Sequence, residues 1–558
     1  MAVIHTRAAM GMAPFAAHVH ALDSALGAGD PLTTFYEWDF GDGEETYNRL
    51  VGWNAAHVYD RPGEYTVRLR LIDAARQETI RTEVIRVVPD RRPRLYVAAS
   101  GDDADSGLSP DRPVRTFRRA MQRLRDGMTV VLRRGDVFDV GQTQHVAKRN
   151  WVLGAYEEGD SPVLRWSGSP GCGAIIALDP AASADVIIED IRFDSIYAAS
   201  PERNLVDAIK LAGRNITVRR CVFADVTTAL NCERRPVGVL SCDNATGGAR
   251  GLGAYYLWGQ GSDHVHIGNT VRGSAHEHNI RLGGTVRALI SHNDLTNAPK
   301  RCIWSMLGEY AYVAGNRLHE GRLTVGPNKA VGHASDRFRW CIVEGNLVEG
   351  GSPGLPAVEI EHGAEHVAVR NNIIKCAGGT CIAVSGHSVR HDRTSADVRI
   401  WHNTGVNDAG LGRFLECGPD VQQVAVLNNL YVAPGLETGT HRSAVLFVLD
   451  SDLRGFTRLE GNIWPIPAAF RWVDNGVHYL WSTWSAAEGY RNPGQWDRLP
   501  QTGRDAYMSV SLDGAYRPGF PDAWSGRVNP VAGAYADFHG AVREAGRRAT
   551  AGAVEVRR

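Results

Sequence analysis

The sequence predicts an all-β protein in which a small β-sandwich is followed by a long β-solenoid. Three observations support this prediction. The first 90 residues contain a Gly-Asp-Gly turn and a strongly alternating strand. A strand-turn-strand unit then recurs along the rest of the 558-residue chain, which is the signature of a solenoid. Within each unit, Val, Ile, Leu and Tyr alternate with polar residues, which is the period of a strand rather than a helix.

Residues 1–90 form the predicted sandwich. The segment YEWDFGDG (36–43) places aromatic residues before a tight turn, and a Pro-Gly turn leads into the alternating strand YTVRLRL (65–71). These segments resemble the PKD domain, an immunoglobulin-like sandwich, and the resemblance implies a spacer or adhesive module of a secreted protein. The acidic turn could bind calcium, but we expect ordinary turn hydrogen bonds. The matching residues are Trp38, Phe40, Gly41, Asp42, Gly43, His57, Tyr59, Pro62, Gly63 and Tyr65.

The second predicted domain spans residues 91–558. Its opening segment (94–150) contains RPVRTFRRAMQRL (112–124), in which apolar residues recur at helical spacing. We expect this helix to cap the solenoid, because an uncovered end coil exposes its core and unpaired strand edges. Residues 471–558 form the predicted closing segment, which is expected to lie against the solenoid.

The predicted coils occupy residues 160–470 and number about eleven or more. A single coil cannot bury its own apolar face, so stacked coils share one core. In most units a strand ends at an Asn, a residue that tolerates the left-handed backbone of a tight turn. Stacked Asn side chains could then bond from coil to coil as a ladder. The anchors of successive units are Asp190, Arg220, Cys242, Asn269, Asn293, Asn316, Asn346, Asn372, Asn403, Asn429 and Asn462.

From about residue 94 to the C-terminus, these repeats resemble the right-handed parallel β-helix proteins of the pectate-lyase-like superfamily. The resemblance is specific for the fold and not for a reaction, because one fold hosts many chemistries. The paired-Asp motif of the polygalacturonases and the DPHD signature of the alginate epimerases are both missing. The resemblance implies a bacterial protein, secreted or on the cell surface, that degrades or binds polysaccharide.

The composition narrows the range of partners. The net charge of −1 provides no field to attract nucleic acid, and no stretch is long and apolar enough for membrane insertion. The first residues lack the apolar core of a signal peptide, so we expect none in this chain. The long predicted loops favour a monomeric state.

Most of the nine cysteines are expected to be buried small residues, although Cys232 with Cys242, or Cys376 with Cys381, could form a disulfide.

The strand before each Asn-ended strand provides the most informative functional pattern. Its alternate residues face outward, and consecutive coils lie about 4.8 Å apart, a step close to one sugar unit. The outward column therefore predicts a groove that binds a polymer along its length. The alternative is an ordinary solvent-exposed face of the sheet. The candidate substrate-binding residues are Lys210, Trp258, Asn279, Arg301, Trp304, Thr324 and His362.

Cationic residues around one part of this column favour β-elimination of a uronate. Arg281 is expected to neutralise the substrate carboxylate. Lys300, His276 or His278 is expected to be the base, and Tyr256 the acid. Lyases of this fold often use Lys or Arg as the base, which the resemblance implies here. A polysaccharide lyase is the preferred prediction.

A second pattern leaves alternatives open. Glu359 and Glu361 are two residues apart on a predicted strand, so their side chains share a face. They could be the carboxylate pair of a glycoside hydrolase or ligands of Ca²⁺, the one cofactor that we consider. A third alternative is a non-catalytic β-helix that binds glycans, acts as an adhesin, or forms a structural surface or phage fibre.

Overall fold

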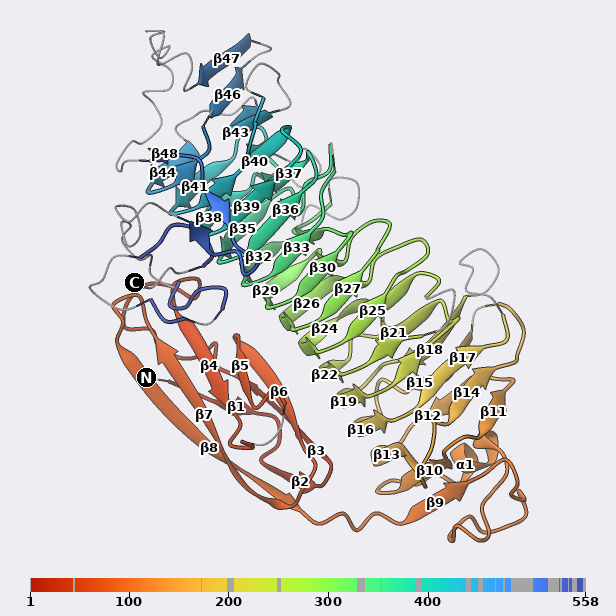
Figure 1. The fold of residues 1–558 in the computed structure, drawn as a ribbon. Coiled ribbons are helices and arrows are strands. Elements are labelled where there is room, and N and C mark those ends of the chain that lie inside the picture. The colour runs from red at the N-terminus through yellow and green to blue at the C-terminus, as the bar shows by residue number, and fades with distance from the viewer. Residues whose placement is uncertain are drawn as a thin grey trace. The chain divides into compact units, whose positions relative to one another are not determined.

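The predicted fold class is confirmed: a β-sandwich precedes a right-handed parallel β-helix, and the described residues contain one α-helix (Figure 1). In this computed structural model the strands of successive coils pair in parallel and nearly in register. The described residues are 2–43, 46–171, 173–197, 205–247, 252–328, 337–352, 354–387, 393–437, 443–449, 455–466, 468–474, 477–482, 505–519, 531, 534–539, 541–543 and 549–554.

The chain divides into two compact units. The first contains Met1–Ala25, Tyr36–Arg70 and Thr79–Ile303, and the second contains Leu26–Phe35, Leu71–Glu78 and Trp304–Arg558. Segments of the sandwich thus belong to both units. The sequence-based boundary between residues 90 and 91 stays a prediction.

The sandwich consists of two sheets. Trp38 is fully buried between them, and its Nε1 donates to the carbonyl of Gly52 at 2.9 Å. One sheet has the order β1-β3-β6, and the other has the order β2-β8-β7-β4-β5. The strands are β1 (His5–Thr6), β2 (Met10–Met12), β3 (Phe15–His20), β4 (Phe35–Asp39), β5 (Arg49–Val51), β6 (Asn54–Tyr59), β7 (Gly63–Ile72) and β8 (Glu78–Val88).

In the first unit the coils build three parallel sheets, here called 1a, 2a and 3a. Sheet 1a contains β9 (Arg94–Val97), β10 (Thr129–Arg133), β13 (Arg149–Tyr156), β16 (Ala184–Glu189), β19 (Arg214–Arg219), β22 (Val237–Cys242) and the second halves of β24 (Tyr255–Ile267) and β26 (Ile280–Ser291). Sheet 2a contains β12 (Gln144–Val146), β15 (Gly173–Leu178), β18 (Val206–Lys210), β21 (Thr228–Cys232) and the first halves of β24 and β26. Sheet 3a contains β11 (Val137–Val140), β14 (Val163–Trp166), β17 (Arg192–Ser195), β20 (Val222–Phe223), β23 (Ala245–Thr246), β25 (Thr270–Arg272) and β27 (Asp294–Thr296).

The second unit also contains three parallel sheets, 1b, 2b and 3b. Sheet 1b contains β29 (Gly308–Ala314), β32 (Phe338–Glu344), β35 (Ala364–Arg370), β38 (Ala396–Trp401), β41 (Gln422–Leu427) and β44 (Phe456–Glu460). Sheet 2b contains β31 (Leu323–Val325), β34 (Val358–Ile360), β37 (Thr380–Val384), β40 (Gly412–Cys417), β43 (Ser443–Leu449), β46 (Ala469–Asp474) and the antiparallel β47 (Val477–Ser482). Sheet 3b contains β30 (Arg317–His319), β33 (Leu347–Glu349), β36 (Ile373–Cys376), β39 (Thr404–Asn407), β42 (Leu430–Val432), β45 (Ile463–Trp464) and β48 (Ala506–Tyr507). The remaining strands are β28 (Ile303–Ser305), β49 (Ser511–Leu512) and β50 (Pro518–Gly519).

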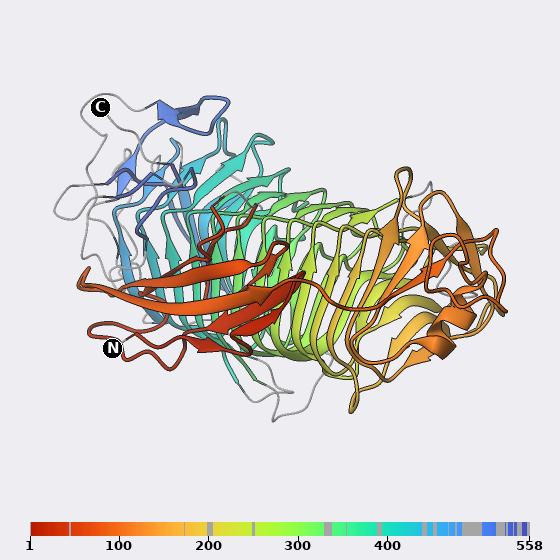
Figure 2. The same ribbon diagram turned by 90° about the horizontal axis from the view of Figure 1, so that it is seen from below.

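The expected capping helix is present as α1 (Phe117–Arg123). The Thr116 side chain caps it by accepting from the backbone N–H of Arg119 at 3.1 Å. Its apolar face packs on β9, β11 and β12 of the first coils (Figure 2), where Phe117 and Ala120 are buried. The helix thereby covers the end of the shared core.

The Asn ladder is confirmed, but its register differs from the prediction in the first three coils. Asn269 Nδ2 donates to Asn293 Oδ1 at 2.8 Å, and Asn244, not Cys242, donates to Asn269 at 3.0 Å. The ladder residue itself is not left-handed. The residue before it takes that backbone, as Gly268 does at φ 68°, so Asp190 and Arg220 occupy the turn and Cys221 occupies the ladder position.

Residues 549–554, the described end of the C-terminal segment, lie against sheet 3b, as expected. Ala551 packs on Leu430 and Ile463, and the backbone N–H of Ala553 donates to Thr404 Oγ1 at 2.8 Å.

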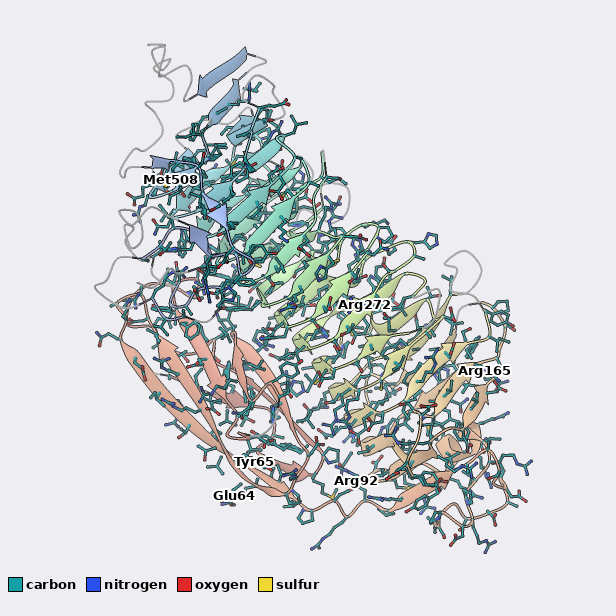
Figure 3. All side chains as sticks on the ribbon, viewed as in Figure 1. Glu64, Tyr65, Arg92, Arg165, Arg272 and Met508 are labelled. Atoms are coloured by element: carbon teal, nitrogen blue, oxygen red, sulfur yellow. The ribbon has the colours of Figure 1, made fainter. Side chains whose placement is uncertain are left out.

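No helix in the described part of the chain is both long and apolar enough to cross a membrane. The outer side of sheet 3a carries pairs of opposite charge on neighbouring coils, such as Arg165 with Asp139 at 2.8 Å, and Figure 3 labels Arg165 and Arg272 there.

Candidate functional site

A column of polar and aromatic side chains crosses four successive strands of sheet 2a. Lys210 on β18 pairs in register with Asn231 on β21, which pairs with Trp258 on β24, which pairs with Arg281 on β26. Lys210, Trp258 and Arg281 are partly exposed. With about 4.8 Å between coils, the column offers one side chain per step along the sheet.

The structure corrects the position of Tyr256. Both Tyr256 and Leu257 are fully buried, so the alternation is interrupted and the outward positions of this strand are Tyr255 and Trp258. The Tyr256 hydroxyl donates to Asn269 Oδ1 at 2.7 Å in the core. Tyr256 therefore supports the ladder and cannot reach a substrate, and its neighbour Tyr255 faces outward instead.

Tyr255 and Arg281 form the centre of the site. Arg281 Nη1 donates to the Tyr255 hydroxyl at 3.3 Å. The Tyr255 ring stacks with Trp258 at 5.8 Å between centroids and with His278 at 6.1 Å. Burial raises the pKa of the Tyr255 phenol, and the nearby guanidinium opposes this shift. The phenol thus keeps its proton and lies beside a cation.

Glu277 connects the remaining candidate residues of this region. Its carboxylate forms an ion pair with Lys300 and lies 3.5 Å from Nε2 of His278. The His278 side chain is only 2% exposed, whereas the Lys300 side chain is 50% exposed. His276 is exposed and Arg301 is partly exposed. Lys300 and His276 are therefore the candidate bases with access to solvent, whereas His278 is enclosed.

A carboxyl group lies at the other end of the column. Asp207 Oδ2 is 3.6 Å from Lys210 Nζ and accepts from Asn231 Nδ2 at 3.0 Å. Burial raises the pKa of Asp207 to about 6, and Lys210 opposes this shift. Above this pH Asp207 neutralises Lys210, and below it Lys210 carries an uncompensated charge.

Asn279, expected to face outward, is fully buried. Its Nδ2 donates to the Thr296 carbonyl at 3.2 Å and contacts Cys302 Sγ at 3.8 Å. The amide lies at the corner between sheets 2a and 3a, where it satisfies a backbone group. It is not available as a substrate contact.

In the second unit, two more predicted contact residues are enclosed. Trp304 is 4% exposed, and its Nε1 donates to the Gly326 carbonyl at 3.2 Å. Thr324 is fully buried and lies 3.4 Å from Glu359 Oε2. The indole is therefore a core residue and cannot stack on a sugar, contrary to the expectation.

The Glu pair is not a matched pair of exposed carboxylates. Glu359 is partly exposed and forms an ion pair with Arg322 at 3.5 Å. Glu361 lies just beyond β34 and is 5% exposed. His362 contacts the Gly386 carbonyl through Nδ1 at 3.3 Å. Glu359 and Glu361 thus differ in exposure, and their role as a glycoside hydrolase pair stays a prediction.

The residues considered for calcium are engaged in other contacts. In the sandwich turn, Asp39 Oδ1 accepts from Gly41 and Asn48, each at 3.0 Å, and Asp42 contacts His57 at 3.1 Å. Glu359 faces a cation, as described above. Among the described residues, no group of three or more His, Cys, Asp or Glu could hold a metal ion.

The cysteines in the described ranges are all thiols. Cys376 and Cys381 are buried, and their sulfur atoms lie 3.2 Å apart in a hydrogen bond. Cys232 and Cys242 are likewise free. Burial raises the pKa of the thiols at Cys221 and Cys302 to about 12, so neither is a reactive thiolate.

Sequence reasoning missed Tyr255, Glu277 and Asp207. Tyr255 adjoins Tyr256, the predicted acid, and only the burial of Tyr256 and Leu257 reveals which tyrosine faces outward. Glu277 lies between two His candidates in SAHEH (274–278), a signal that was available. Asp207 begins the segment DAIKL (207–211), whose Lys alone was chosen.

Residues 13–88 match the family profile of the PKD domain. Among solved structures, the chain is similar to the Dettilon tailspike protein, with 11% identity over 64% of this chain and 67% of that chain and a TM-score of 0.44. It is also similar to a PL6 alginate lyase in complex with a trisaccharide, with 12% identity over 70% of this chain and 92% of that chain and a TM-score of 0.43. A third similar structure is the pectate lyase Pel9A, with 11% identity over 84% of this chain and 98% of that chain and a TM-score of 0.36. Similarity at this level concerns the fold alone.

Proposed function

We propose that sheet 2a of the first unit is the active site of a polysaccharide lyase that cleaves an acidic polysaccharide by β-elimination. The observation that carries the proposal is the contact between Arg281 and Tyr255, 3.3 Å apart on the outer face of adjacent coils. A cation, a protonated phenol and the Trp258 ring therefore meet in one place. Elimination from a uronate requires a cation and an acid, and the ring supplies a surface for a sugar.

The reaction follows from these positions. Arg281 pairs with the carboxylate of the uronate and stabilises the negative charge that develops when C5 loses its proton. Lys300 takes that proton onto its neutral amine, and Tyr255 gives its proton to the oxygen that leaves C4. The C5–H and C4–O bonds break, and a C4=C5 double bond forms. One product then carries an unsaturated uronate and the other a free hydroxyl.

Glu277 is a positioning residue in this scheme. It binds the Lys300 ammonium in the free protein and contacts His278, so it fixes both groups beside Tyr255. A lysine amine accepts a proton only after losing its own, so Lys300 must release its proton before it acts as the base.

The remaining column extends the binding site. Trp258, Asn231 and Lys210 follow at successive coils, each about 4.8 Å further along. An acidic polymer lying on this column would place a sugar over the indole and an acidic group at Lys210. We also propose that the protein is secreted or on the cell surface, where its polysaccharide partner occurs.

The first experiment incubates the protein with a panel of acidic polysaccharides, with calcium and with a chelator. It follows the ultraviolet absorbance of the unsaturated product and the reducing ends in parallel. Arg281→Ala should lower kcat/KM by about 10²–10³-fold, because it removes the group that stabilises the developing charge. The matched control is Arg272→Ala, an exposed Arg on sheet 3a that pairs with Asp294, and it should keep full activity.

Other outcomes would overturn the proposal in distinct ways. Reducing ends without the absorbance would indicate a hydrolase. Binding without either product would indicate a non-catalytic glycan-binding protein. Elimination that survives Arg281→Ala would place the active site elsewhere.

A further inference from the structure

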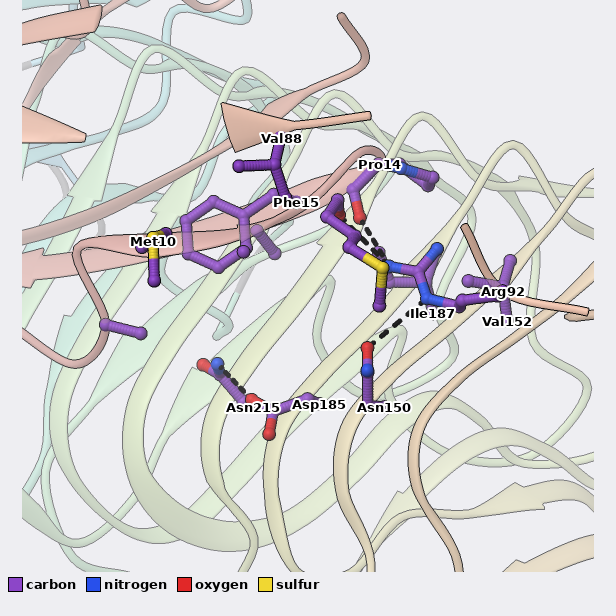
Figure 4. A pocket seen from close by; sticks show the side chains of 14 residues that line it. Met10, Pro14, Phe15, Val88, Arg92, Asn150, Val152, Asp185, Ile187 and Asn215 are labelled. Carbon is purple, nitrogen blue, oxygen red and sulfur yellow. Dashed lines mark hydrogen bonds between the residues drawn. The ribbon is translucent and has the colours of Figure 1, made fainter. Parts of the chain in front are cut away.

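A cavity of about 400 Å³ lies in the first unit, between the sandwich and sheet 1a (Figure 4). Its volume is within the range of small-molecule binding sites. It lies on a different sheet from Tyr255 and Arg281, and the proposed lyase reaction does not use it. It is lined on one side by residues of β2, β3 and β8 and on the other by residues of β13, β16 and β19.

The sandwich side of the cavity is apolar. Met10, Phe15 and Val88 lie along it in Figure 4. Met10 is 65% exposed and Val88 is 40% exposed, which is unusual for large apolar side chains at the junction of two packed parts. This wall therefore retains apolar surface that an occupant of the cavity would remove from water.

The solenoid side is polar and repeats with the coils. Asn150, Asp185 and Asn215 occupy matching positions on consecutive strands and have left-handed backbones at φ 50°, 55° and 60°. Asn215 Nδ2 donates to Asp185 Oδ1 at 2.8 Å. The other Asn215 atom, Oδ1, is buried and accepts no hydrogen bond from any residue that the structure describes. Because this oxygen is shielded from solvent, an occupant of the cavity would meet the exposed carboxylate of Asp185, which can accept hydrogen bonds.

The charges of the cavity oppose an anionic occupant. Arg92 is buried and already engaged: it pairs with Asp90 at 3.2 Å and donates to the Met12 carbonyl at 3.0 Å and to Asn150 Oδ1 at 3.2 Å. Asp185, in contrast, is exposed. The accessible charge in the cavity is therefore negative.

We infer that this cavity is a second carbohydrate-binding site, specific for an uncharged glycan. A sugar has an apolar face that suits Met10 and Phe15 and hydroxyl groups that can donate to the exposed carboxylate of Asp185. The polar side chains repeat about every 4.8 Å, a step close to one sugar residue in a chain. The site would hold the protein on a neutral glycan while sheet 2a acts on an acidic one, but it does not depend on the lyase activity.

The test is native affinity electrophoresis of the full chain in gels that contain soluble β-1,3-glucan, xylan, mannan or starch. At least one of these should retard the protein. Met10→Ser removes exposed apolar surface, and Asp185→Gly removes the exposed acceptor while keeping a residue that accepts a left-handed backbone. Each should raise the apparent Kd at least about fivefold, the effect of one lost hydrogen bond or a comparable apolar contact.

Two matched variants serve as controls. Ile80→Ser changes an exposed apolar residue of β8 outside the cavity, and Asn297→Gly changes an exposed Asn with φ 50°. Both should bind like the unchanged protein. Failure of all four glycans to retard the protein would overturn the inference, as would equal retardation of all four variants. Neither result would bear on the unsaturated product that defines the lyase activity.

Discussion

Two neighbouring tyrosines show how strongly one residue's position decides its role. Tyr255 is partly exposed and bonds Arg281 at 3.3 Å, whereas Tyr256 is buried and bonds two ladder amides. The phenol groups are chemically the same. Only their direction from the strand separates a candidate acid from a structural residue.

We expect opposite effects from removing these two hydroxyls. Tyr255→Phe should lower kcat about 10²-fold or more, since the proposed acid is lost, with little change in the free energy of unfolding. Tyr256→Phe should leave kcat nearly unchanged but cost about 1–3 kcal/mol of stability, because it leaves buried partners unsatisfied. Kinetics on the unsaturated product and urea unfolding of both variants provide the comparison. Similar kinetic losses in both would refute the assignment of Tyr255.

The residue scale is also where sequence reasoning was least reliable. Alternation predicted that Lys210 and Arg281 face outward, and both are partly exposed. It failed at Tyr256 and Trp304, which are buried. A coil turns a corner every few residues, so a short strand does not keep the strict period of two on which alternation depends.

At the scale of elements, the Asn ladder has a direction. Within each unit, a ladder Asn donates from its backbone N–H and its Nδ2 to the Oδ1 of the ladder residue in the next coil, as Asn372 does to Asn403 at 3.1 and 2.9 Å. The first member needs only a backbone donor, and Cys221 supplies one at 2.9 Å. The last member needs only an acceptor, and Asp505 accepts from Asn462 at 2.9 Å. Residues other than Asn are therefore tolerated at the two ends.

A change in the middle of the ladder should cost more than one at its start. Asn372→Ala should lower the free energy of unfolding by about 3 kcal/mol or more, since it removes an amide that bonds Val343, Arg370 and both adjacent coils. Cys221→Ala keeps the backbone donor and should cost less than half as much. Chemical denaturation measures both. Equal losses would show that the ladder adds nothing beyond core packing.

The repeat itself was predictable because every coil presents the same strand pattern. The sequence placed the later ladder members, from Asn269 onward, correctly. It misplaced the first three by one or two residues, because Asp190 and Arg220 are polar turn residues and Cys242 ends a strand. The ladder positions of the second and third coils are held by Cys221 and Asn244, and the spacing of the repeat alone does not distinguish them from the neighbouring Arg220 and Cys242.

At the scale of a whole unit, the sandwich of the first unit is bound to the coils by buried charges. Arg219 on sheet 1a is 5% exposed and bridges Asp60 of the sandwich and Glu189 of the neighbouring coil. Arg7 of the sandwich pairs with Asp263. Within this unit the sandwich is therefore attached by specific contacts, which extends the spacer role implied by its resemblance.

Breaking this bridge should be costly. Arg219→Met should lower the free energy of unfolding by about 3–5 kcal/mol, because it leaves Asp60 without its ion-pair partner and Glu189 with Arg220 alone. The adjacent Arg220, whose side chain is 40% exposed, is the matched control, and Arg220→Met should cost about 1 kcal/mol or less. Calorimetry of both variants tests this. A cost for Arg219→Met no larger than the control would show that the bridge does not stabilise the unit.

Buried histidines should make the first unit sensitive to acid. Burial lowers the pKa of His18 to about 3 and of His264 to about 4, both below the ordinary value of 6.5. Their stabilising effect is complete above pH 6.5 and is lost as the pH falls toward 4, because only the unfolded chain then binds the proton.

Each of these histidines should lower the free energy of unfolding by about 2 kcal/mol when the pH falls from 7 to 5. Urea unfolding at both values should show the loss, and His18→Leu should reduce it, whereas His145→Gln at an exposed position should not. A pH dependence unchanged by His18→Leu would assign the effect to other groups.

Because the ladder has a direction, every coil presents the same hydrogen-bonding groups to its neighbours, and one coil can replace another. In the second unit, the segments between Asn346 and Asn372 and between Asn372 and Asn403 differ in length, 26 and 31 residues, yet each presents one donor pair and one acceptor to its neighbours. Duplicating or deleting such a segment leaves every remaining amide matched. Evolution or engineering can therefore lengthen or shorten this protein by whole coils without changing the residues at the two ends of the ladder.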